Sequence, residues 1–305
     1  MANLQITSNF VGDHAGNYIS AALKSAKTLD YLTVLENVKF KRNISTLAAT
    51  GGTALIQNAS CDFTDLGELS MTEKILTPKN LAINIDLCKN ELLEDWQSLQ
   101  MTAGAHNSTM SSDFAAYVMS YLADTIANGT ENSCWTGAAA NAGEFEGFTT
   151  GTTGAYAVDA PTTDAASTYT VGTIITNLEN IVEAIPSNIY AKASEDLYIF
   201  MNPKSYRMYI SAISTLGYNN LYNMNADYVP TFNGIKIAVV GGIGDSKMVA
   251  AEKGNQFFGT DLLSDATQIN MLDMAQLDGS DNLRVVVKYS GEVQTGVASD
   301  IVYQS

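Results

Sequence analysis

Residues 71–92 read M-T-E-K-I-L-T-P-K-N-L-A-I-N-I-D-L-C-K-N-E-L, and this stretch decides the fold. From Leu81 to Leu87 the apolar side chains fall on every second position, which is the period of a strand with one buried face. If extension reaches back to Ile75, the strand is roughly 43 Å long, whereas a compact chain of this length has a radius of gyration of about 19 Å. The pattern therefore predicts a ribbon that leaves its own domain.

A proline and a second extended run place this strand in a hairpin. Pro78 cannot donate to a central ladder, so the strand starts at Pro78 or lies at a sheet edge there. Residues 38–44 also alternate apolar and polar side chains, and the pair Gly51-Gly52 that follows favours a turn. Two extended runs therefore flank residues 51–70.

The composition favours a protein that contacts other proteins. The chain has 305 residues, enough for one large or two ordinary domains. Charged residues make up only 16%, against roughly 25% in an ordinary soluble protein. The net charge of -16 excludes a nucleic-acid binder of the type that holds phosphates with clustered Lys and Arg.

The lack of a recognisable targeting signal and the cysteine usage predict a cytosolic chain. No window of about 18 apolar residues predicts a transmembrane helix, and the first residues lack the pattern of a secretory signal. Cys61, Cys88 and Cys134 are far apart and form no C-x-x-C motif, so we expect reduced thiols.

Helical periodicity predicts three helices in the first half of the chain. The first follows Asp13 and ends near Ala26, and a short one spans residues 89–100. The longest opens at Ser111-Ser112, carries an apolar stripe from Phe114 to Ile126, and is expected to stop at Asn128-Gly129 after roughly 25 Å.

A second unit begins near Val171. It is expected to hold a helix over 174–185 ended by Pro186, a strand over 196–201, and then a helix with Asn202 as N-cap and Pro203 at its first position. Residues 283–303 predict two further strands joined by a glycine-centred turn.

No catalytic, cofactor or metal site is predicted. The only histidines are His14 and His106, and no G-x-S-x-G motif accompanies His106, for which a loop or capping role is favoured. Gly242 and Gly244 are followed by Lys247 where a dinucleotide motif requires glycine, so a turn explains them better. We therefore favour a structural protein over an enzyme.

Three segments resemble the major capsid proteins of tailed bacteriophages, which have the Hong Kong 97 fold. They are C-D-F-T-D-L-G-E-L-S-M-T-E-K-I-L-T-P-K-N-L-A-I-N-I-D-L-C-K-N-E-L-L-E-D-W (Cys61 to Trp96), W-T-G-A-A-A-N-A-G-E-F-E-G-F (Trp135 to Phe148), and the ending F-F-G-T-D-L-L-S-D with V-K-Y-S-G-E-V-Q-T-G-V-A-S-D-I-V-Y. The resemblance covers roughly the whole chain and rests on the order and spacing of these segments.

The resemblance implies an α+β fold in four parts. Residues 1–32 correspond to an N-terminal arm and 33–88 to the extended hairpin called the E-loop. Residues 89–170 and 269–305 correspond to a peripheral domain with a long spine helix, and 171–268 to an axial domain. In such shells the E-loop lies across a neighbouring subunit, so we expect another copy to cover the apolar face of residues 81–87.

The implied function is self-assembly into hexamers and pentamers of an icosahedral or prolate head around phage DNA. The implied partners are copies of the chain, a portal, a separate scaffold or decoration protein, and double-stranded DNA bound without sequence specificity. The resemblance implies no cofactor and no membrane, with assembly in the bacterial cytoplasm and a final location in the virion.

The expected inter-subunit contacts lie on the hairpin and on a tyrosine-rich axial loop: Phe40, Lys41, Arg42, Leu81, Ile83, Ile85, Tyr218, Tyr222 and Tyr228. Two alternatives stay open. A phage tail, fibre or adhesin component is suggested by the Thr-, Gly- and Asn-rich strands. A glycosidase using Glu91 and Glu94 would need that carboxylate pair in a pocket.

Overall fold

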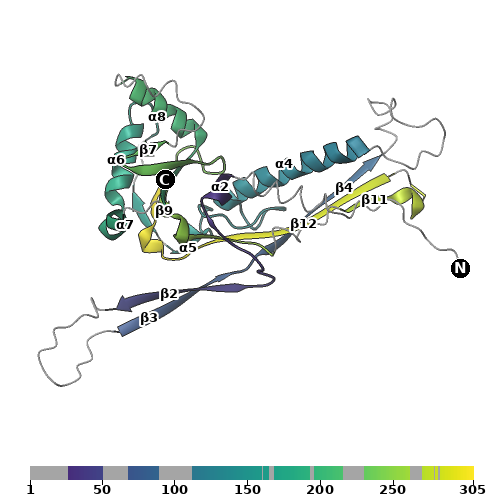
Figure 1. The fold of residues 1–305 in the computed structure, drawn as a ribbon, viewed down its shortest axis with the longest axis horizontal. Helices are drawn as coiled ribbons and strands as arrows, with labels where there is room; N and C mark the ends of the chain where they lie inside the picture. The colour runs from purple at the N-terminus through teal and green to yellow at the C-terminus, as the bar shows by residue number, and fades with distance from the viewer. Residues whose placement is uncertain are drawn as a thin grey trace, which may run out of the picture.

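The computed structural model describes residues 27–50, 68–88, 112–159, 161–164, 168–192, 196–215, 230–261, 270–277, 279–280 and 282–305. The strands of these residues form two sheets and a separate two-stranded ribbon. The molecule is elongated (Figure 1). Helices and strands both contribute, as the α+β class requires.

The first sheet is built on one long strand, β12 (Asn282–Thr295). Along one side β12 pairs antiparallel with β4 (Lys79–Cys88), from Asn282↔Cys88 to Gly291↔Lys79. On its other side lie β11 (Asn270–Asp273) and β10 (Gln256–Gly259), and β1 (Thr33–Leu35) pairs parallel with β10. Alternate residues of β12 are buried, which is the period-2 pattern of a sheet with one covered face.

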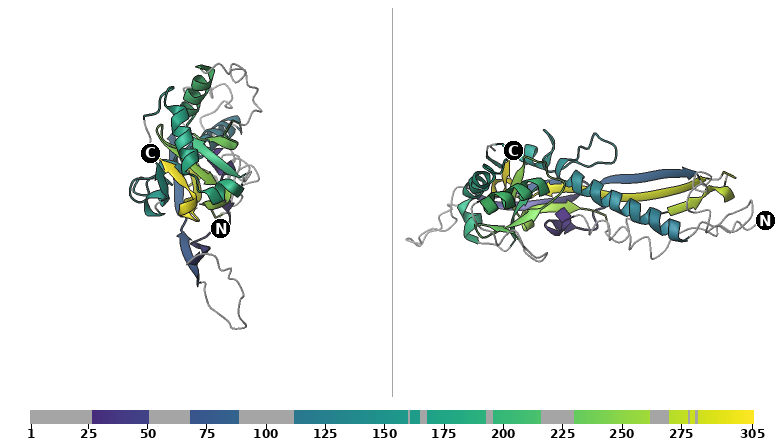
Figure 2. Two further views of the ribbon diagram at one scale, coloured as in Figure 1. Left: turned by 90° about the vertical axis from the view of Figure 1, so that its left-hand side faces the viewer. Right: turned by 90° about the horizontal axis from the view of Figure 1, so that it is seen from above.

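Helix α4 (Ser112–Thr136) lies along this sheet (Figure 2). The predicted end at Asn128-Gly129 is wrong, because the helix continues for two further turns. Glycine inside a helix costs about 1 kcal/mol relative to alanine, and burial on one face outweighs that cost. The buried positions recur every four residues across the predicted stop: Leu122, Ile126, Thr130 and Cys134.

The second sheet has the order β5-β13-β9-β6-β8-β7. Its strands are β5 (Thr162–Asp164), β6 (Leu197–Met201), β7 (Thr231–Phe232), β8 (Ile235–Val239), β9 (Met248–Glu252) and β13 (Val302–Gln304). Helices α6 (Ile174–Ala184) and α8 (Pro203–Thr215) pack on it through a second apolar cluster. The predicted cap is confirmed, since Lys204 N donates to Asn202 Oδ1 at 2.9 Å.

The remaining elements are short. They are α2 (Lys27–Asp30), α5 (Ala155–Asp159), α7 (Ser187–Lys192), and the 3-10 turns η3 (Lys253–Asn255), η4 (Met274–Gln276) and η5 (Ala298–Asp300). The two predicted C-terminal strands are present, but they divide between the sheets: β12 ends at Thr295, before Gly296, and β13 joins β9.

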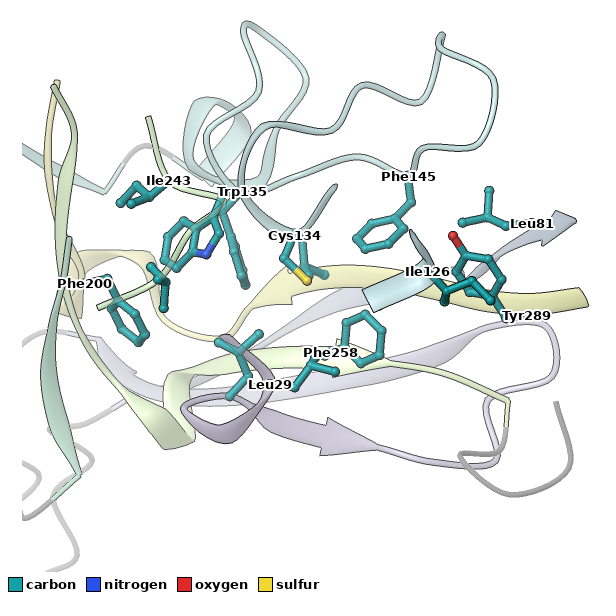
Figure 3. Close-up of a cluster of buried hydrophobic side chains, with 14 of the residues drawn as sticks. Leu29, Leu81, Ile126, Cys134, Trp135, Phe145, Phe200, Ile243, Phe258 and Tyr289 are labelled. Atoms are coloured by element: carbon teal, nitrogen blue, oxygen red, sulfur yellow. The ribbon is translucent and has the colours of Figure 1, made fainter. Parts of the chain in front are cut away.

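One core connects α4 to both sheets (Figure 3). Trp135 at the end of α4 lies 5.2 Å from Phe200 of β6, measured between ring centroids, and Phe145 lies 6.0 Å from Phe258 of β10. Cys134 is a free, buried cysteine, and burial raises the pKa of its thiol well above the usual value. It therefore serves as a small apolar core residue.

Candidate assembly surface

Two strands, β2 (Arg42–Thr50) and β3 (Glu68–Leu76), form a ribbon within residues 33–88, where the resemblance implied an extended hairpin. They pair antiparallel from Arg42↔Leu76 to Thr50↔Glu68 and form their own sheet. The alternating residues 81–87, which were expected to continue this ribbon, lie in β4 of the first sheet instead. In Figure 1 the ribbon projects from the body, away from the second sheet and from α4. A two-stranded hairpin alone in water is only marginally stable, so this ribbon requires a contact along one face.

The two faces of the ribbon differ in chemistry. Residues directly opposite in an antiparallel pair point to the same side, so Leu47 and Met71 share a face with Leu69 and Ile75. We name these four side chains the apolar ribbon face. Their exposed fractions are 64% for Leu47, 65% for Met71, 65% for Leu69 and 51% for Ile75. The same face also carries Ser45 opposite Glu73, and Asn43, whose Nδ2 donates to Glu73 Oε2 at 3.1 Å. The opposite face carries Thr46, Thr72, Ser70, Ile44 and Lys74. Exposed apolar side chains gathered on a projecting element are typical of an interaction surface.

The predicted contact residues at the ribbon base are accessible. Phe40 is 76% exposed, and Lys41 and Arg42 are exposed at the start of β2. Tyr218, Tyr222 and Tyr228 lie outside the described residues, so their role stays a prediction. The same holds for His14, His106, Glu91 and Glu94.

The expectation that another copy covers residues 81–87 needs correction. Leu81 is only 8% exposed and belongs to the core, beside Tyr289 in Figure 3. Ile83 and Ile85 pack against the same core. The physical reason is the break at Pro78: the chain before it enters the ribbon, whereas the chain after it pairs with β12 and is covered by its own fold.

The ribbon base is attached to the body by three contacts. Leu76 is fully buried against Gly259 of β10, where an added Cβ would lie 1.9 Å from Leu76 Cδ2. Lys74 Nζ lies 2.5 Å from the Asp159 carboxylate and 3.1 Å from Thr295 Oγ1. Gln294 Nε2 donates to the Ile75 carbonyl at 3.3 Å. These contacts fix where the ribbon leaves the body.

A fourth contact lies at the joint itself. Thr77 N donates to Glu292 Oε2 at 2.5 Å. Burial raises the pKa of Glu292 to about 7, although the Thr77 hydrogen bond and Lys79 lower it, and Glu146 raises it further. This carboxyl group is therefore partly protonated near neutral pH.

No protein-family model matches the chain, and no curated protein sequence matches it. Among solved structures, one described as Gordonia phage Cozz superposes with a TM-score of 0.58 at 11% identity, covering 92% of this chain and 86% of the other. The capsid of an empty GTA particle gives 0.56 at 12% identity, covering 92% and 89%.

The capsid of Myoviridae phage XM1 gives a TM-score of 0.54 at 12% identity over 100% of this chain and 95% of the other. This chain has the phage capsid fold. The resemblance to tailed-phage major capsid proteins stated from the sequence is thus confirmed for the fold. At such low identity the agreement concerns the fold alone. A function for this chain is therefore inferred from its own body and ribbon.

The capsid-fold body contains a polar junction that the sequence did not predict. The Glu131 carboxylate on α4 accepts from Thr28 N at 2.9 Å, from Thr28 Oγ1 at 2.7 Å and from Gly241 N at 3.0 Å. Trp135 Nε1 donates to the same Thr28 hydroxyl at 2.9 Å. The junction therefore ties α2, α4 and the loop after β8 together.

The glycines after β8 also have a structural explanation. A Cβ on Gly242 would lie 2.0 Å from the Glu131 carbonyl oxygen, so only glycine permits this approach to α4. Within the described ranges no group of three acidic, His or Cys side chains is arranged to hold a metal ion. No helix among these residues is long and apolar enough to cross a membrane.

Adding one methyl group at Gly259 is expected to loosen the ribbon base. Gly259→Ala forces Leu76 out of its buried position, and overpacking of this kind costs about 1–3 kcal/mol. Urea unfolding should show that loss, and limited proteolysis should cut the ribbon faster. Gly254→Ala is the matched control, because nothing lies within 4 Å of a Cβ there. Equal stability of the two variants would contradict the contact.

Proposed function

We propose that this chain is the major shell subunit of a tailed-phage head. Copies assemble into hexamers and pentamers of an icosahedral or prolate shell that encloses double-stranded DNA, and the chain performs no chemical reaction. The observation that carries the proposal is the apolar ribbon face, presented by a projecting element of a capsid-fold chain. It supports contacts between copies because every copy presents the same face.

The energetics of the apolar ribbon face favour association. Burying a Leu or Met side chain contributes about 1.5–3 kcal/mol, and in a closed shell each subunit both gives and receives one ribbon. Phe40, Lys41 and Arg42 are exposed at the ribbon base and stay predicted contacts. Leu81 plays no part in this association, because its own fold buries this side chain. Ile83 and Ile85 are only partly covered by that core and stay predicted contacts, as do the three tyrosines.

The net charge fits a container for DNA. An acidic chain with a charge of -16 repels phosphates, which suits a wall that holds a genome without binding its sequence. A portal and a separate scaffold or decoration protein complete the proposed set of partners. The solved structures of similar fold include a satellite phage P4 procapsid with a size-determination protein, which supports a separate partner of that kind here. Assembly takes place in the host cytoplasm and ends in the virion.

Size-exclusion chromatography with light scattering tests this function on the full chain. The expected result is a mass corresponding to pentamers, hexamers or larger closed or curved assemblies that grows with protein concentration. A discrete trimer at all concentrations and salts would instead support a tail, fibre or adhesin component.

A further inference from the structure

The polar junction at Glu131 fixes the place where the N-terminal part of the chain meets the body. Thr28 donates to the Glu131 carboxylate twice, from its backbone N–H at 2.9 Å and from its hydroxyl at 2.7 Å. Trp135 Nε1 holds the same hydroxyl at 2.9 Å. Because Thr28 is held against α4, residues 1–26, which we call the N-terminal segment, are attached to the body beside α4.

A cavity of about 400 Å³ lies at this point, between α4 and the second sheet. Its lining on α4 comes from positions three and four residues apart, which share one face of a helix: Asp124, Ala127, Asn128 and Glu131. Lys27 of α2, Pro203 at the start of α8 and Val239 at the end of β8 line it as well. Pockets of roughly 300–1,000 Å³ hold drug-sized ligands, so this cavity has room for several side chains of a peptide.

The cavity combines an apolar lining with an acidic edge. Ala127 is buried on its α4 side, whereas Asp124 and Asn128 are exposed. The Glu131 carboxylate is already occupied by Thr28 and by Gly241 N. Asp124 is therefore the acid that this face leaves available, and among the described residues no cation forms an ion pair with it.

The composition of the N-terminal segment favours binding to a surface. Of its 26 residues 13 are apolar, and only Asp13 and Lys24 are charged at pH 7. Segments that stay disordered in water have the opposite composition, with few apolar residues and a high net charge. Leu23 comes four residues before Lys27, and four residues span at most about 14 Å, so Leu23 is within reach of the cavity that Lys27 lines.

We propose that the N-terminal segment binds in this cavity of its own chain, with Leu23 against Ala127 and Val239 and with Lys24 beside Asp124. A short tether gives a segment an effective concentration on the order of millimolar, which favours its own cavity over that of a second copy. The bound segment contacts α4, α8 and β8 together, and so it braces α4 against the second sheet. The contact lies within one chain and does not depend on assembly into a shell.

A pair of engineered cysteines tests the contact on the full chain. Leu23→Cys with Ala127→Cys should form a disulfide under mild oxidation, found as a cross-linked 23–127 peptide in the single-chain band of a non-reducing gel. Leu23→Cys with Thr125→Cys is the matched control, because Thr125 is exposed and lies about 200° around the helix from Ala127. Its cross-linked fraction should be roughly tenfold lower, since distant cysteines cannot be bridged. Cys61→Ser and Cys88→Ser in both variants leave buried Cys134 as the one native thiol.

Trypsin cleavage after Lys24 gives a second measurement that needs no cysteine. Leu23→Ser removes the apolar anchor, so cleavage should become roughly tenfold faster or more than in the wild type. Leu4→Ser is the matched control, because it removes a leucine that is far along the chain from Lys27, and it should be cleaved at the wild-type rate.

Three results would overturn the proposal. They are a 23–127 disulfide found only in the dimer band, which would assign the cavity to a second copy, equal cross-linking of the two cysteine pairs, and a Leu23→Ser variant that is cleaved no faster than the wild type. Light scattering on the same samples separates this contact from the proposed function. A single-chain disulfide in a protein that does not associate would support the contact and contradict the shell.

Discussion

The double variant Leu47→Lys, Met71→Glu should lose self-association by more than 100-fold while the single chain stays folded. The two side chains lie directly opposite each other on the apolar ribbon face and are exposed in the single chain. Burial of each in a contact between copies contributes about 1.5–3 kcal/mol, so the pair contributes about 3–6 kcal/mol. The opposite charges preserve attraction across the ribbon, and exposed substitutions usually change stability by about 0.5 kcal/mol or less.

The control for this variant uses the other face of the same ribbon. Thr46 and Thr72 are also directly paired, with their hydroxyl oxygens 2.6 Å apart. Thr46→Lys, Thr72→Glu introduces the same charges and should leave association largely intact. Light scattering over a concentration series compares the two pairs. Equal losses in both would contradict the assignment of the contact to the apolar ribbon face.

Trp135→Ala should cost about 3–5 kcal/mol of the free energy of unfolding. Trp135 is fully buried, its ring lies 5.2 Å from that of Phe200 and 5.5 Å from that of Phe148, and its Nε1 donates to Thr28. The substitution leaves a cavity where α4 meets the second sheet, and it removes a donor from the Glu131 junction. Urea unfolding should show a lower midpoint with little change in slope.

Tyr121→Ala is the control for this substitution. Tyr121 lies on the same helix α4 but is largely exposed, so its loss should cost less than about 0.5 kcal/mol. If Trp135→Ala proved as mild as Tyr121→Ala, the core of Figure 3 would not be what joins the two sheets.

Local chemistry accounts for the parts of the fold that could be predicted. The start of α8 could be predicted because it depends on two adjacent residues. The Asn202 side chain accepts a hydrogen bond from the first turn of the helix, and the ring of Pro203 fixes a helical φ at the first position. Pro78 was predicted to be the start or an edge of a strand for the same reason, and β4 begins at the next residue. The end of α4 was mispredicted at Gly129, since the burial that extends the helix comes from sheets that are distant in sequence.

The candidate site was predictable only in outline. Alternation predicted that residues 81–87 are extended, but it placed them in the ribbon. Their pairing with β12, about 200 residues later, puts them in the first sheet and covers Leu81, and no local pattern encodes that pairing. Glu292 and Thr77 are likewise 215 residues apart, and Thr28 and Glu131 are 103 apart. The apolar ribbon face could be found only once the register Leu47↔Met71 was known.

Electron microscopy of the assembled full chain tests the central claim most directly. We expect closed or curved particles built from rings of five and six copies, with density for the β2–β3 ribbon lying on an adjacent subunit through Leu47, Leu69, Met71 and Ile75. Particles built as trimers or fibres, or rings in which the apolar ribbon face points into solvent, would contradict the claim.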